Sequence, residues 1–402
     1  MGRRVVVVGA GQAGASLTAK LRDLGHDGSI ALIGDEPDPP YQRPPLSKKY
    51  LLGEMERERL YLKPERFYAE HDIALIKGEP VIGIDRSRQE VITAAQRVPY
   101  DVLALTTGSR PRLLPKEMGG DLEGVYAVRT LADTDAMADA FRPEHRVLIV
   151  GGGYIGLEAA AVARARGLHT VLIEAAPRIL GRVAAPETAD YFRALHRNNG
   201  VDLREGVGLR RLVGDGRVRE AHLADGAVLE IDFAVIGIGI DPAAELAEAA
   251  GLTIDNGIAV DGRCQTSDPA IFAAGDCASF PWEGGRIRLE SVQNAIDQAE
   301  HAAAVIEGAE TDYRPVPWFW SDQYAARLQI AGLNTGYDRI ITRPGLREGS
   351  QSVWYFRGER FLAVDAMSDP KSYMQGKRWL EAGASPPPDA LADPDRALKS
   401  LV

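Results

Sequence analysis

The 402-residue sequence contains very little cysteine, with Cys264 and Cys277 as its two examples. No Cys-x-x-Cys pair and no cysteine–histidine cluster with metal-ligand spacing occurs, so the sequence disfavours both a disulfide framework and a structural zinc site. We therefore expect no bound metal. Dithiol redox chemistry is disfavoured for the same reason, since two neighbouring thiols are missing.

Long apolar runs and an excess of positive charge are also missing. No stretch approaches the roughly 18 consecutive apolar residues of a membrane span. The first run, Val5–Val8, is too short for an export signal and is followed by a glycine turn. The formal net charge is −10, which disfavours nucleic acid as the main partner because phosphate binding needs a basic surface. These features predict a cytoplasmic protein without a membrane or nucleic-acid partner.

One pattern occurs twice in the chain. Residues 3–35 and 146–174 each contain an apolar run, the motif G-x-G-x-x-G, an Ala-rich helical stretch and a second apolar run that ends in an acid. The glycines at 9, 11 and 14 recur at 151, 153 and 156, a constant offset of 142 residues. We therefore predict two copies of one β-α-β unit.

Each copy has the context that a dinucleotide-binding turn requires. The closing acids, Asp35 and Glu174, lie 21 and 18 residues beyond the third glycine, close to the roughly 20 expected of a ribose ligand. The first glycine permits a tight turn, the second lets pyrophosphate approach the backbone, and the third lets the helix pack on the strand. The helix N-terminus then attracts the phosphates. Both units are thus predicted to bind dinucleotides.

The remaining segments predict smaller structural units. Residues 99–108 and 263–278 each contain a short buried strand, and the runs at 340–342, 352–356 and 360–366 are typical of antiparallel strands. The Pro- and Asp-rich tail after residue 383 is expected to pack loosely. The predicted fold class is α/β, with two Rossmann-like dinucleotide-binding domains plus a C-terminal α+β domain. The predicted domains are residues 1–108 with 240–311 for the first dinucleotide, 109–239 for the second, and 312–402 at the C-terminus.

Several longer motifs carry a family resemblance over the whole chain. The sequence resembles the FAD-dependent NADH:[2Fe–2S] ferredoxin reductases of bacterial haem monooxygenase and ring-hydroxylating dioxygenase systems, in the pyridine nucleotide-disulfide oxidoreductase superfamily. Rubredoxin reductases and the apoptosis-inducing-factor group are relatives. The motifs are YQRPPLSKKYL (41–51), TTGSRP (106–111), VRTLAD (128–133), GGGYIGLEAA (151–160), GIGIDP (237–242), GDCA (275–278), ESVQNA (290–295) and PWFWSDQY (317–324). The chain departs from the family at Ala243, where an Asn usually follows the proline, which puts a local loop contact in doubt.

The resemblance implies two cofactor sites. For FAD, the implied residues are Gly9, Gly11, Ala13, Gly14, Asp35, Arg43, Lys48, Val81, Thr107, Gly108, Arg129, Asp276, Val292 and Trp320. For NADH, they are Gly151, Gly153, Tyr154, Ile155, Gly156, Glu174, Arg182, Gly237, Ile238 and Gly239. Lys48, Glu158 and Trp320 are the implied catalytic residues, with Glu158 paired to Lys48 at the nicotinamide and Trp320 beside the flavin ring.

The expected chemistry needs no protein nucleophile. Hydride moves directly from nicotinamide C4 to flavin N5, so the main demand on the protein is stacking geometry. A carboxylate at position 174 binds both ribose hydroxyls and repels a 2′-phosphate, which favours NADH over NADPH, although Arg178 could weaken that preference.

The resemblance also implies the acceptor. We expect single electrons to pass to a [2Fe–2S] ferredoxin that supplies an oxygenase. The reductase itself is expected to be a monomer or a weak homodimer. A basic set comprising Arg57, Arg59, Lys371, Lys377 and Arg378 is a candidate docking patch, with scattered solvated charge as the alternative. Rubredoxin reductase and NADH oxidase are alternative enzymes. An apoptosis-inducing-factor-like flavoprotein is an alternative from another class, disfavoured because neither a targeting peptide nor a basic surface is evident.

Overall fold

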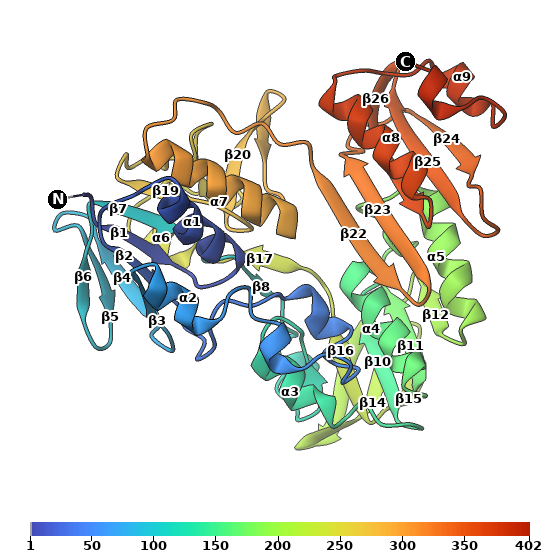
Figure 1. Ribbon diagram of the computed structural model, residues 1–402. Coiled ribbons are helices and arrows are strands. Elements are labelled where there is room, and N and C mark those ends of the chain that lie inside the picture. The colour runs from blue at the N-terminus through green and yellow to red at the C-terminus, as the bar shows by residue number, and fades with distance from the viewer. Residues whose placement is uncertain (1) are drawn as a thin grey trace. The chain divides into compact units, whose positions relative to one another are not determined.

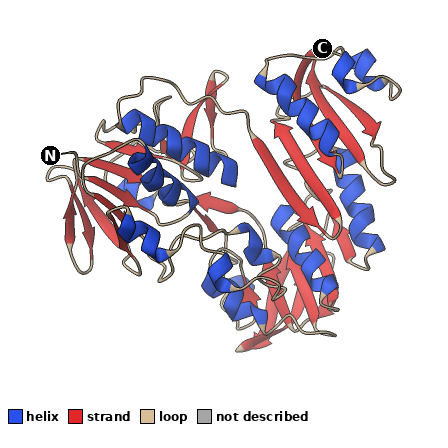
Figure 2. Ribbon diagram, viewed as in Figure 1, coloured by secondary structure: helices blue, strands red, loops and turns tan. Residues whose placement is uncertain are grey.

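The computed structural model describes residues 2–402, and the chain divides into two compact units (Figure 1). The first unit consists of Met1–Arg43, Glu56–Arg110 and Ile240–Pro315. The second consists of Pro44–Met55, Pro111–Gly239 and Val316–Val402. Each unit mixes helices with strands, as Figure 2 shows in blue and red.

A five-stranded parallel sheet forms the centre of the first unit, with the order β19-β7-β1-β2-β3. Its strands are β1 (Val5–Val8), β2 (Ile30–Ile33), β3 (Ile73–Ile76), β7 (Val102–Leu105) and β19 (Ile271–Ala273). Strand β1 pairs with β2 on one side and β7 on the other. All four valines of β1 are buried, which explains an apolar run without polar alternation.

Helices α1 (Gln12–Asp23) and α7 (Val292–Ile306) pack against each other beside this sheet, in dark blue and orange in Figure 1. Smaller sheets with the orders β4-β5-β6, β18-β20-β21 and β8-β17 complete the unit. The remaining elements are η2 (Arg57–Arg59), α2 (Glu65–Glu70), β4 (Val81–Asp85), β5 (Glu90–Thr93), β6 (Arg97–Pro99), β8 (Ser109–Pro111), β17 (Ile240–Pro242), α6 (Glu245–Ala249), β18 (Ile258–Ala259), β20 (Ala278–Trp282) and β21 (Gly285–Ile287).

The second unit contains a similar parallel sheet, with the order β12-β11-β10-β16-β9. Its strands are β9 (Val125–Tyr126), β10 (Arg146–Val150), β11 (His169–Glu174), β12 (Asp202–Glu205) and β16 (Phe233–Ile236). Around it lie η1 (Pro44–Ser47), η3 (Lys116–Met118), α3 (Leu131–Ala138), α4 (Tyr154–Ala165), α5 (Pro186–Asn198) and the antiparallel strands β13 (Leu209–Asp215), β14 (Arg217–Leu223) and β15 (Val228–Glu230). The expected repeat of one β-α-β unit is therefore present, as β1-α1-β2 and β10-α4-β11.

The C-terminal part of the second unit is a five-stranded antiparallel sheet with the order β22-β23-β26-β25-β24. Its elements are β22 (Trp318–Gln323), β23 (Ala326–Gly332), β24 (Arg339–Pro344), β25 (Gln351–Arg357), β26 (Arg360–Met367) and the helix α8 (Pro370–Glu381), which packs on β23 and β26. The three strands predicted at 340–342, 352–356 and 360–366 are confirmed as β24, β25 and β26.

The prediction of a loosely packed tail is wrong. Helix α9 (Pro388–Ala392) and the turn η4 (Leu398–Ser400) follow α8, and Leu391 is fully buried. The Arg343 guanidinium donates hydrogen bonds to backbone carbonyl oxygens of Leu391, Asp393, Pro394 and Arg396. One side chain thus satisfies four carbonyl groups and anchors a segment whose composition alone is typical of a loop.

A buried polar cluster joins the C-terminal sheet to α5. Asp365 of β26 accepts hydrogen bonds from the hydroxyls of Tyr355 and Thr188, and the Tyr355 hydroxyl accepts one from the backbone N–H of Ala185. Burial raises the pKa of Asp365 to about 6. Ala185 is the N-cap residue of α5, so the Tyr355 hydroxyl satisfies one backbone N–H at the start of this helix, while Asp365 binds the Thr188 side chain.

Candidate functional site

The first glycine turn follows β1 directly. Gly9 has φ of +111°, a conformation that other residues rarely adopt, and a Cβ there would lie 2.2 Å from the carbonyl oxygen of Thr106. A Cβ on Gly14 would lie 2.1 Å from the carbonyl oxygen of Gly9. A Cβ on Gly11 would meet no atom of the described chain within 4 Å. The first and third glycines are thus required by the chain itself, whereas the second borders open space.

The second glycine turn repeats this geometry in the other unit. Gly151 also has φ of +111°, and a Cβ on it would lie 2.2 Å from the carbonyl oxygen of Gly237. A Cβ on Gly156 would lie 2.0 Å from the carbonyl oxygen of Gly151, and one on Gly153 would meet no described atom within 4 Å. Two turns separated by 142 residues therefore offer the same cradle of backbone.

The two helix N-termini that border these turns are suited to an anion. Gly11 and Gly153 are the N-cap residues of α1 and α4, and within residues 2–402 neither helix has a side-chain cap or an acid in its first turn. The first N–H groups of each helix therefore remain available to phosphate oxygens, and the helix dipole favours negative charge there. This geometry fits the pyrophosphate of a dinucleotide.

An acid stands at or just beyond the end of the neighbouring strand in each unit. Asp35 is exposed just after β2. Glu174 is the last residue of β11, and its two carboxylate oxygens accept hydrogen bonds from the backbone N–H groups of Gly152 and Ala176, both at 2.7 Å. Each oxygen keeps a lone pair for a ribose hydroxyl. Glu174 thus stabilises its own glycine turn, and its contact with a ribose stays a prediction.

Arg43 pairs with Glu36, an acidic neighbour that the sequence did not predict. Its guanidinium pairs with Glu36 at 2.6 Å, and the Tyr41 hydroxyl also donates to Glu36. Burial lowers the pKa of Arg43, but the nearby groups Glu36 and Asp35 contribute to a net rise. The predicted contact of Arg43 with the phosphates stays a prediction.

Threonines connect the strand β7 to the first glycine turn and to the loop after β17. The Thr106 hydroxyl donates to the carbonyl oxygen of Gly9 at 2.8 Å, a contact that the sequence did not predict. The Thr107 hydroxyl donates to the carbonyl oxygen of Ala243, whose N–H donates to Gly108 at 2.9 Å. The loop that departs from the family at Ala243 is therefore held through its backbone.

The Gly-Asp segment after β19 lies beside α1. A Cβ on Gly275 would lie 3.1 Å from the Cβ of Ala13, so this segment and the first glycine turn share one region of the unit. Asp276 accepts a hydrogen bond from the Ser109 hydroxyl at 2.8 Å. The N–H of Gly275 donates to the side-chain oxygen of Gln298 on α7. Gln298, buried and distant in sequence, is a positioning residue that sequence reasoning missed.

Two further FAD candidates lie at the starts of elements in the first unit. Val81 is the first residue of β4 and is half-buried. Val292 is the first residue of α7, whose N-cap Ser291 accepts a hydrogen bond from the N–H of Asn294. Their contacts with adenine and with the flavin ring stay predictions.

The segment Pro44–Met55 belongs to the second unit, where it packs on α4. The ammonium of Lys48 lies 2.9 Å from a carboxylate oxygen of Glu158, which confirms the predicted pairing. The Ser47 hydroxyl donates to the other oxygen at 3.2 Å. Farther along, the Arg166 guanidinium donates to the carbonyl oxygens of Leu51 and Leu52. Helix α4 thus fixes this segment at two points, one of them an ion pair.

Burial dominates the electrostatics of the Lys48–Glu158 pair. Glu158 is buried, and desolvation raises its pKa, while the charge of Lys48 and hydrogen bonds from Ser321, Lys48 and Ser47 oppose that rise. A carboxylate in such surroundings needs its partners to stay ionised. Buried carboxyl groups with shifted pKa values are typical of functional sites.

Arg129 and Trp320 also belong to the second unit. Arg129 precedes the N-cap of α3, and its N–H donates to Asp133 at 3.0 Å. Trp320 lies on β22, with its ring 5.6 Å from that of Trp318. The assignments of Arg129, Trp320 and Lys48 to FAD stay predictions.

The remaining NADH candidates surround the second glycine turn. Tyr154 begins α4, with its ring 4.8 Å from that of Phe319, and Ile155 is 45% exposed. The run Gly237–Gly239 follows β16, and the N–H of Gly237 donates to Val150. A guanidinium nitrogen of Arg182 lies 3.7 Å from the position of a Cβ on Gly239. The structure thus gathers Arg182, the 237–239 run and the turn at the carboxyl edge of one sheet.

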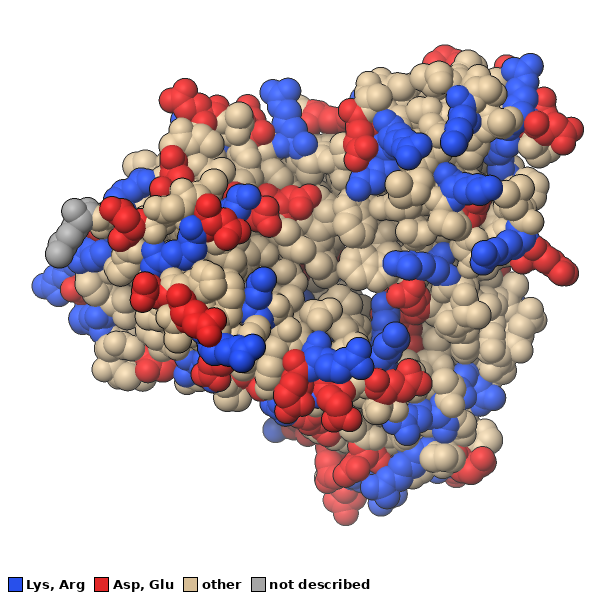
Figure 3. All heavy atoms as spheres, in the orientation of Figure 1, with Lys and Arg blue, Asp and Glu red and all other residues tan. Residues whose placement is uncertain are grey.

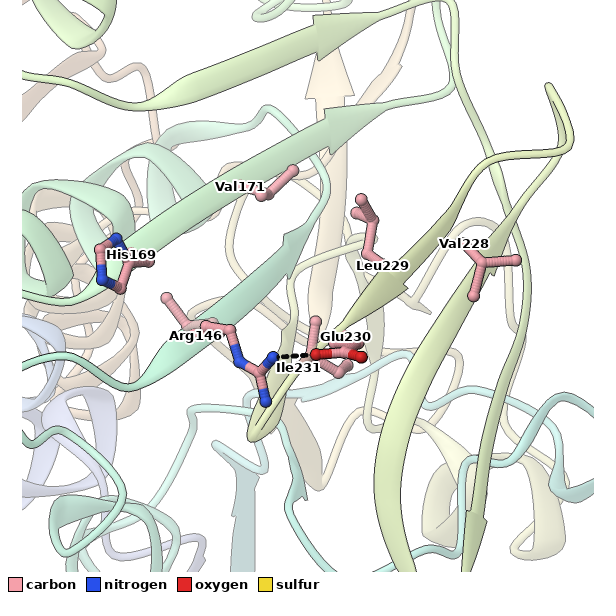
Figure 4. Close-up of a pocket in the computed structure, with 8 residues that line it drawn as sticks. Arg146, His169, Val171, Val228, Leu229, Glu230 and Ile231 are labelled. Atoms are coloured by element: carbon pink, nitrogen blue, oxygen red, sulfur yellow. Dashed lines mark hydrogen bonds and ion pairs between the residues drawn. The ribbon is translucent and has the colours of Figure 1, made fainter.

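A surface hollow in the second unit lies at the opposite edge of this sheet. Arg146 and His169, the first residues of β10 and β11, line it together with Val228 and Leu229, and Arg146 pairs with Glu230 (Figure 4). Ligands of open parallel sheets bind at the carboxyl ends of the strands. The hollow is therefore not the dinucleotide site.

Neither cysteine offers an alternative redox centre. Cys264 and Cys277 are free and buried, and burial raises the pKa of both thiols. Thiolates are the reactive form of cysteine, so such thiols are inert. Within residues 2–402 no group of three or more His, Cys, Asp and Glu side chains could hold a metal ion, and no helix is long and apolar enough to cross a membrane.

Comparison with known proteins assigns the fold. The family model described as pyridine nucleotide-disulphide oxidoreductase matches residues 3–299, and the model described as reductase C-terminal matches residues 318–402. The chain belongs to the pyridine nucleotide-disulphide oxidoreductase family. As a member of this family it is an oxidoreductase, and FAD and NAD(H) are its cofactors.

Individual relatives match nearly the whole of this chain. Rhodocoxin reductase of Rhodococcus erythropolis is 42% identical over 402 residues, which cover 99% of this chain and 94% of the relative. Putidaredoxin reductase CamA of Pseudomonas putida is 41% identical over 406 residues, with 99% and 96% covered. A crystal structure of the covalent putidaredoxin reductase–putidaredoxin complex superposes with a TM-score of 0.96 at 40% identity, covering 99% and 98% of the chains.

Matched valine substitutions test which turn holds which nucleotide. Gly11→Val and Gly153→Val place a side chain where the described chain leaves space, so both variants are expected to fold. Gly11→Val should purify without FAD. Gly153→Val should keep its FAD but show a KM for NADH raised roughly 100-fold, since lost pyrophosphate contacts cost about 2–3 kcal/mol. Absorbance of bound flavin and NADH-dependent flavin reduction measure the two effects.

Each variant is the control for the other. Loss of FAD from Gly153→Val with retention in Gly11→Val would reverse the assignment. Normal FAD content and a normal KM in both variants would show that neither turn contacts pyrophosphate.

Proposed function

We propose that this protein is a reductase that takes hydride from NADH onto FAD and passes single electrons to a [2Fe–2S] ferredoxin, which supplies a monooxygenase or dioxygenase. The observation that carries the proposal is the same glycine turn built twice, in two separate units. We assign FAD to the turn of Gly9, Gly11 and Gly14 and NADH to the turn of Gly151, Gly153 and Gly156. The boundaries 1–108 with 240–311, 109–239 and 312–402 and a cytoplasmic location also stay proposals.

The proposed roles of the protein groups are binding and positioning. When bound, FAD supplies the conversion between two-electron and one-electron transfer. The glycine turns and helix N-termini bind pyrophosphate, and Asp35 and Glu174 bind ribose. Lys48 forms an ion pair with Glu158 of α4, and Glu158 lies two residues after Gly156 of the second glycine turn. We propose that this pair orients the nicotinamide and that Trp320 excludes water beside the flavin.

The second unit favours NADH over NADPH. The Glu174 carboxylate repels a 2′-phosphate. Arg178 donates hydrogen bonds through Nη2 to the carbonyl oxygens of Gly181 and Ala184, the latter at 2.8 Å, while its buried Nη1 has no hydrogen-bond partner within residues 2–402. The backbone thus binds only part of this guanidinium, and an opposing effect of Arg178 on nucleotide choice stays a prediction.

Replacing the Glu174 carboxylate should relax the choice of nucleotide. The double variant Glu174→Ala with Ala175→Arg removes the repulsion and adds a cation, and should shift the kcat/KM ratio of NADPH to NADH by roughly 10- to 100-fold. Glu174→Gln is the control, since an amide oxygen still accepts a backbone hydrogen bond from the glycine turn but carries no charge. The kcat/KM ratio of NADPH to NADH in Glu174→Gln should lie between the ratios of the unaltered protein and the double variant. An unchanged ratio in the double variant would remove Glu174 from the ribose site.

The electron acceptor is inferred from the named relatives and from surface charge. Putidaredoxin reductase forms a covalent complex with putidaredoxin in the solved structure. On the face shown in Figure 3, lysine and arginine side chains gather over the C-terminal domain. Helix α8 contributes Lys371, Lys377 and Arg378, with Lys377 lying over the ring of Trp318. An acidic ferredoxin fits this charge. Arg57 of the first unit pairs with Asp38 at 2.7 Å, which weakens its place in the patch.

Acceptor dependence distinguishes a ferredoxin reductase from the alternatives. After NADH reduces the flavin, cytochrome c should be reduced rapidly only when a [2Fe–2S] ferredoxin is added. A panel with several ferredoxins and a rubredoxin, followed by stopped-flow absorbance, identifies the acceptor. Rapid reduction by rubredoxin alone would indicate a rubredoxin reductase. Consumption of NADH by oxygen at the same rate without any added protein would indicate an oxidase.

A further inference from the structure

Behind Glu158, buried polar side chains form a continuous hydrogen-bonded chain. The Ser321 hydroxyl lies 2.6 Å from Oε1 of Glu158, and Nε2 of Gln323 lies 3.2 Å from the Ser321 hydroxyl. Nε2 of His196 lies 2.8 Å from Oε1 of Gln323. The Tyr324 hydroxyl, 3.4 Å from Nδ1 of His196, ends the chain. The path therefore runs from the ion pair through β22 to α5.

The alternation of a β-strand brings these groups together. Side chains two residues apart share one face of a strand, so Phe319, Ser321 and Gln323 all point from β22 toward the same side. That side meets Tyr154 and Glu158 of α4, and His196 in the last turn of α5.

The donors of this chain are ordered in one direction. A carboxylate only accepts hydrogen bonds, so the Ser321 hydroxyl donates to Glu158 and accepts from the amide of Gln323. The amide oxygen of Gln323 then accepts from Nε2–H of His196. Nδ1 of a neutral imidazole accepts from Tyr324. His196 is fully buried, and burial lowers its pKa, which agrees with a neutral ring. Hydrogen bonds ordered in this way strengthen one another.

We propose that Ser321, Gln323 and His196 are positioning residues that keep the Glu158 carboxylate ionised and directed at Lys48. The groups facing Glu158 are Lys48 and Ser47 from the segment 44–55 and Ser321 from β22. An amide does not readily relay a proton, so these hydrogen-bonded side chains orient the carboxylate and do not transfer protons to it. The inference rests on the proposed place of the Lys48–Glu158 pair at the nicotinamide.

The titration of Glu158 in the FAD-bound enzyme tests this chain without measuring turnover. Infrared spectra of protein carrying ¹³C-labelled glutamate report the protonated carboxyl band, assigned to Glu158 by its absence from Glu158→Gln. Gln323→Leu keeps the side-chain size but removes both hydrogen bonds. It should raise the midpoint of this band by roughly half to one pH unit, although residue 323 does not touch Glu158. Ser321→Ala should raise it further, and Ser321→Thr, which restores a hydroxyl, should reverse most of the change.

Ser352→Ala is the matched control, since it removes a buried serine hydroxyl from the same sheet and should leave the midpoint unchanged. A midpoint that moves in Ser321→Ala but stays constant in Gln323→Leu would overturn the proposed roles of Gln323 and His196. Because the band reports the carboxyl itself, this result is independent of whether NADH or ferredoxin is the true substrate.

The unaltered protein offers a second test if the variants fold poorly. Nitrogen-15 shifts of His196 should show a neutral ring protonated at Nε2 across the pH range in which the enzyme is stable. An imidazolium, or a neutral ring protonated at Nδ1, would reverse the order of donors and contradict the proposal.

Discussion

The close approach of a helix to the end of a strand is the constraint on which both nucleotide sites depend. In each unit, the third glycine of the motif lies so near the carbonyl oxygen of the first that a Cβ would come within 2.1 Å at Gly14 and 2.0 Å at Gly156. The helices α1 and α4 can therefore begin directly at the strand ends, where their first N–H groups have no side-chain cap within residues 2–402. The surrounding contacts preserve this geometry: Thr106 binds the first turn, and Glu174 binds the second.

The second unit contains a buried polar cluster around α4. Helix α4 begins at the glycine turn and carries Glu158, which pairs with Lys48 and accepts a hydrogen bond from Ser321 of the C-terminal sheet. Tyr355 and Asp365 of the same sheet bind the N-terminus of α5, through the backbone N–H of Ala185 and the hydroxyl of Thr188. The C-terminal sheet thus supplies one of the groups that surround the carboxylate near the second glycine turn.

Local patterns in the sequence predicted much of this fold. The glycine spacing, the apolar runs and the closing acids predicted both β-α-β units, and short runs rich in apolar residues predicted β24 to β26, because each depends on neighbours within a few residues. The contact of Gln323 with His196 spans 127 residues, and no local pattern reports it; the only signal was that Ser321 and Gln323, two residues apart in WFWSDQ, share one face of a strand. The tail was predicted wrongly because its packing depends on Arg343, about 50 residues away. The Lys48–Glu158 pair followed from family resemblance and not from spacing.

The most direct test of the account is anaerobic titration of the FAD-bound protein with NADH, followed by the flavin absorbance. The account predicts complete bleaching by one equivalent of NADH, and slower bleaching when the transferred hydrogen at nicotinamide C4 is deuterium, because hydride passes directly between the two nucleotides. Flavin that stays oxidised in excess NADH would contradict the account. So would a bleaching rate in single-turnover experiments that is the same with NADH and with both epimers deuterated at nicotinamide C4.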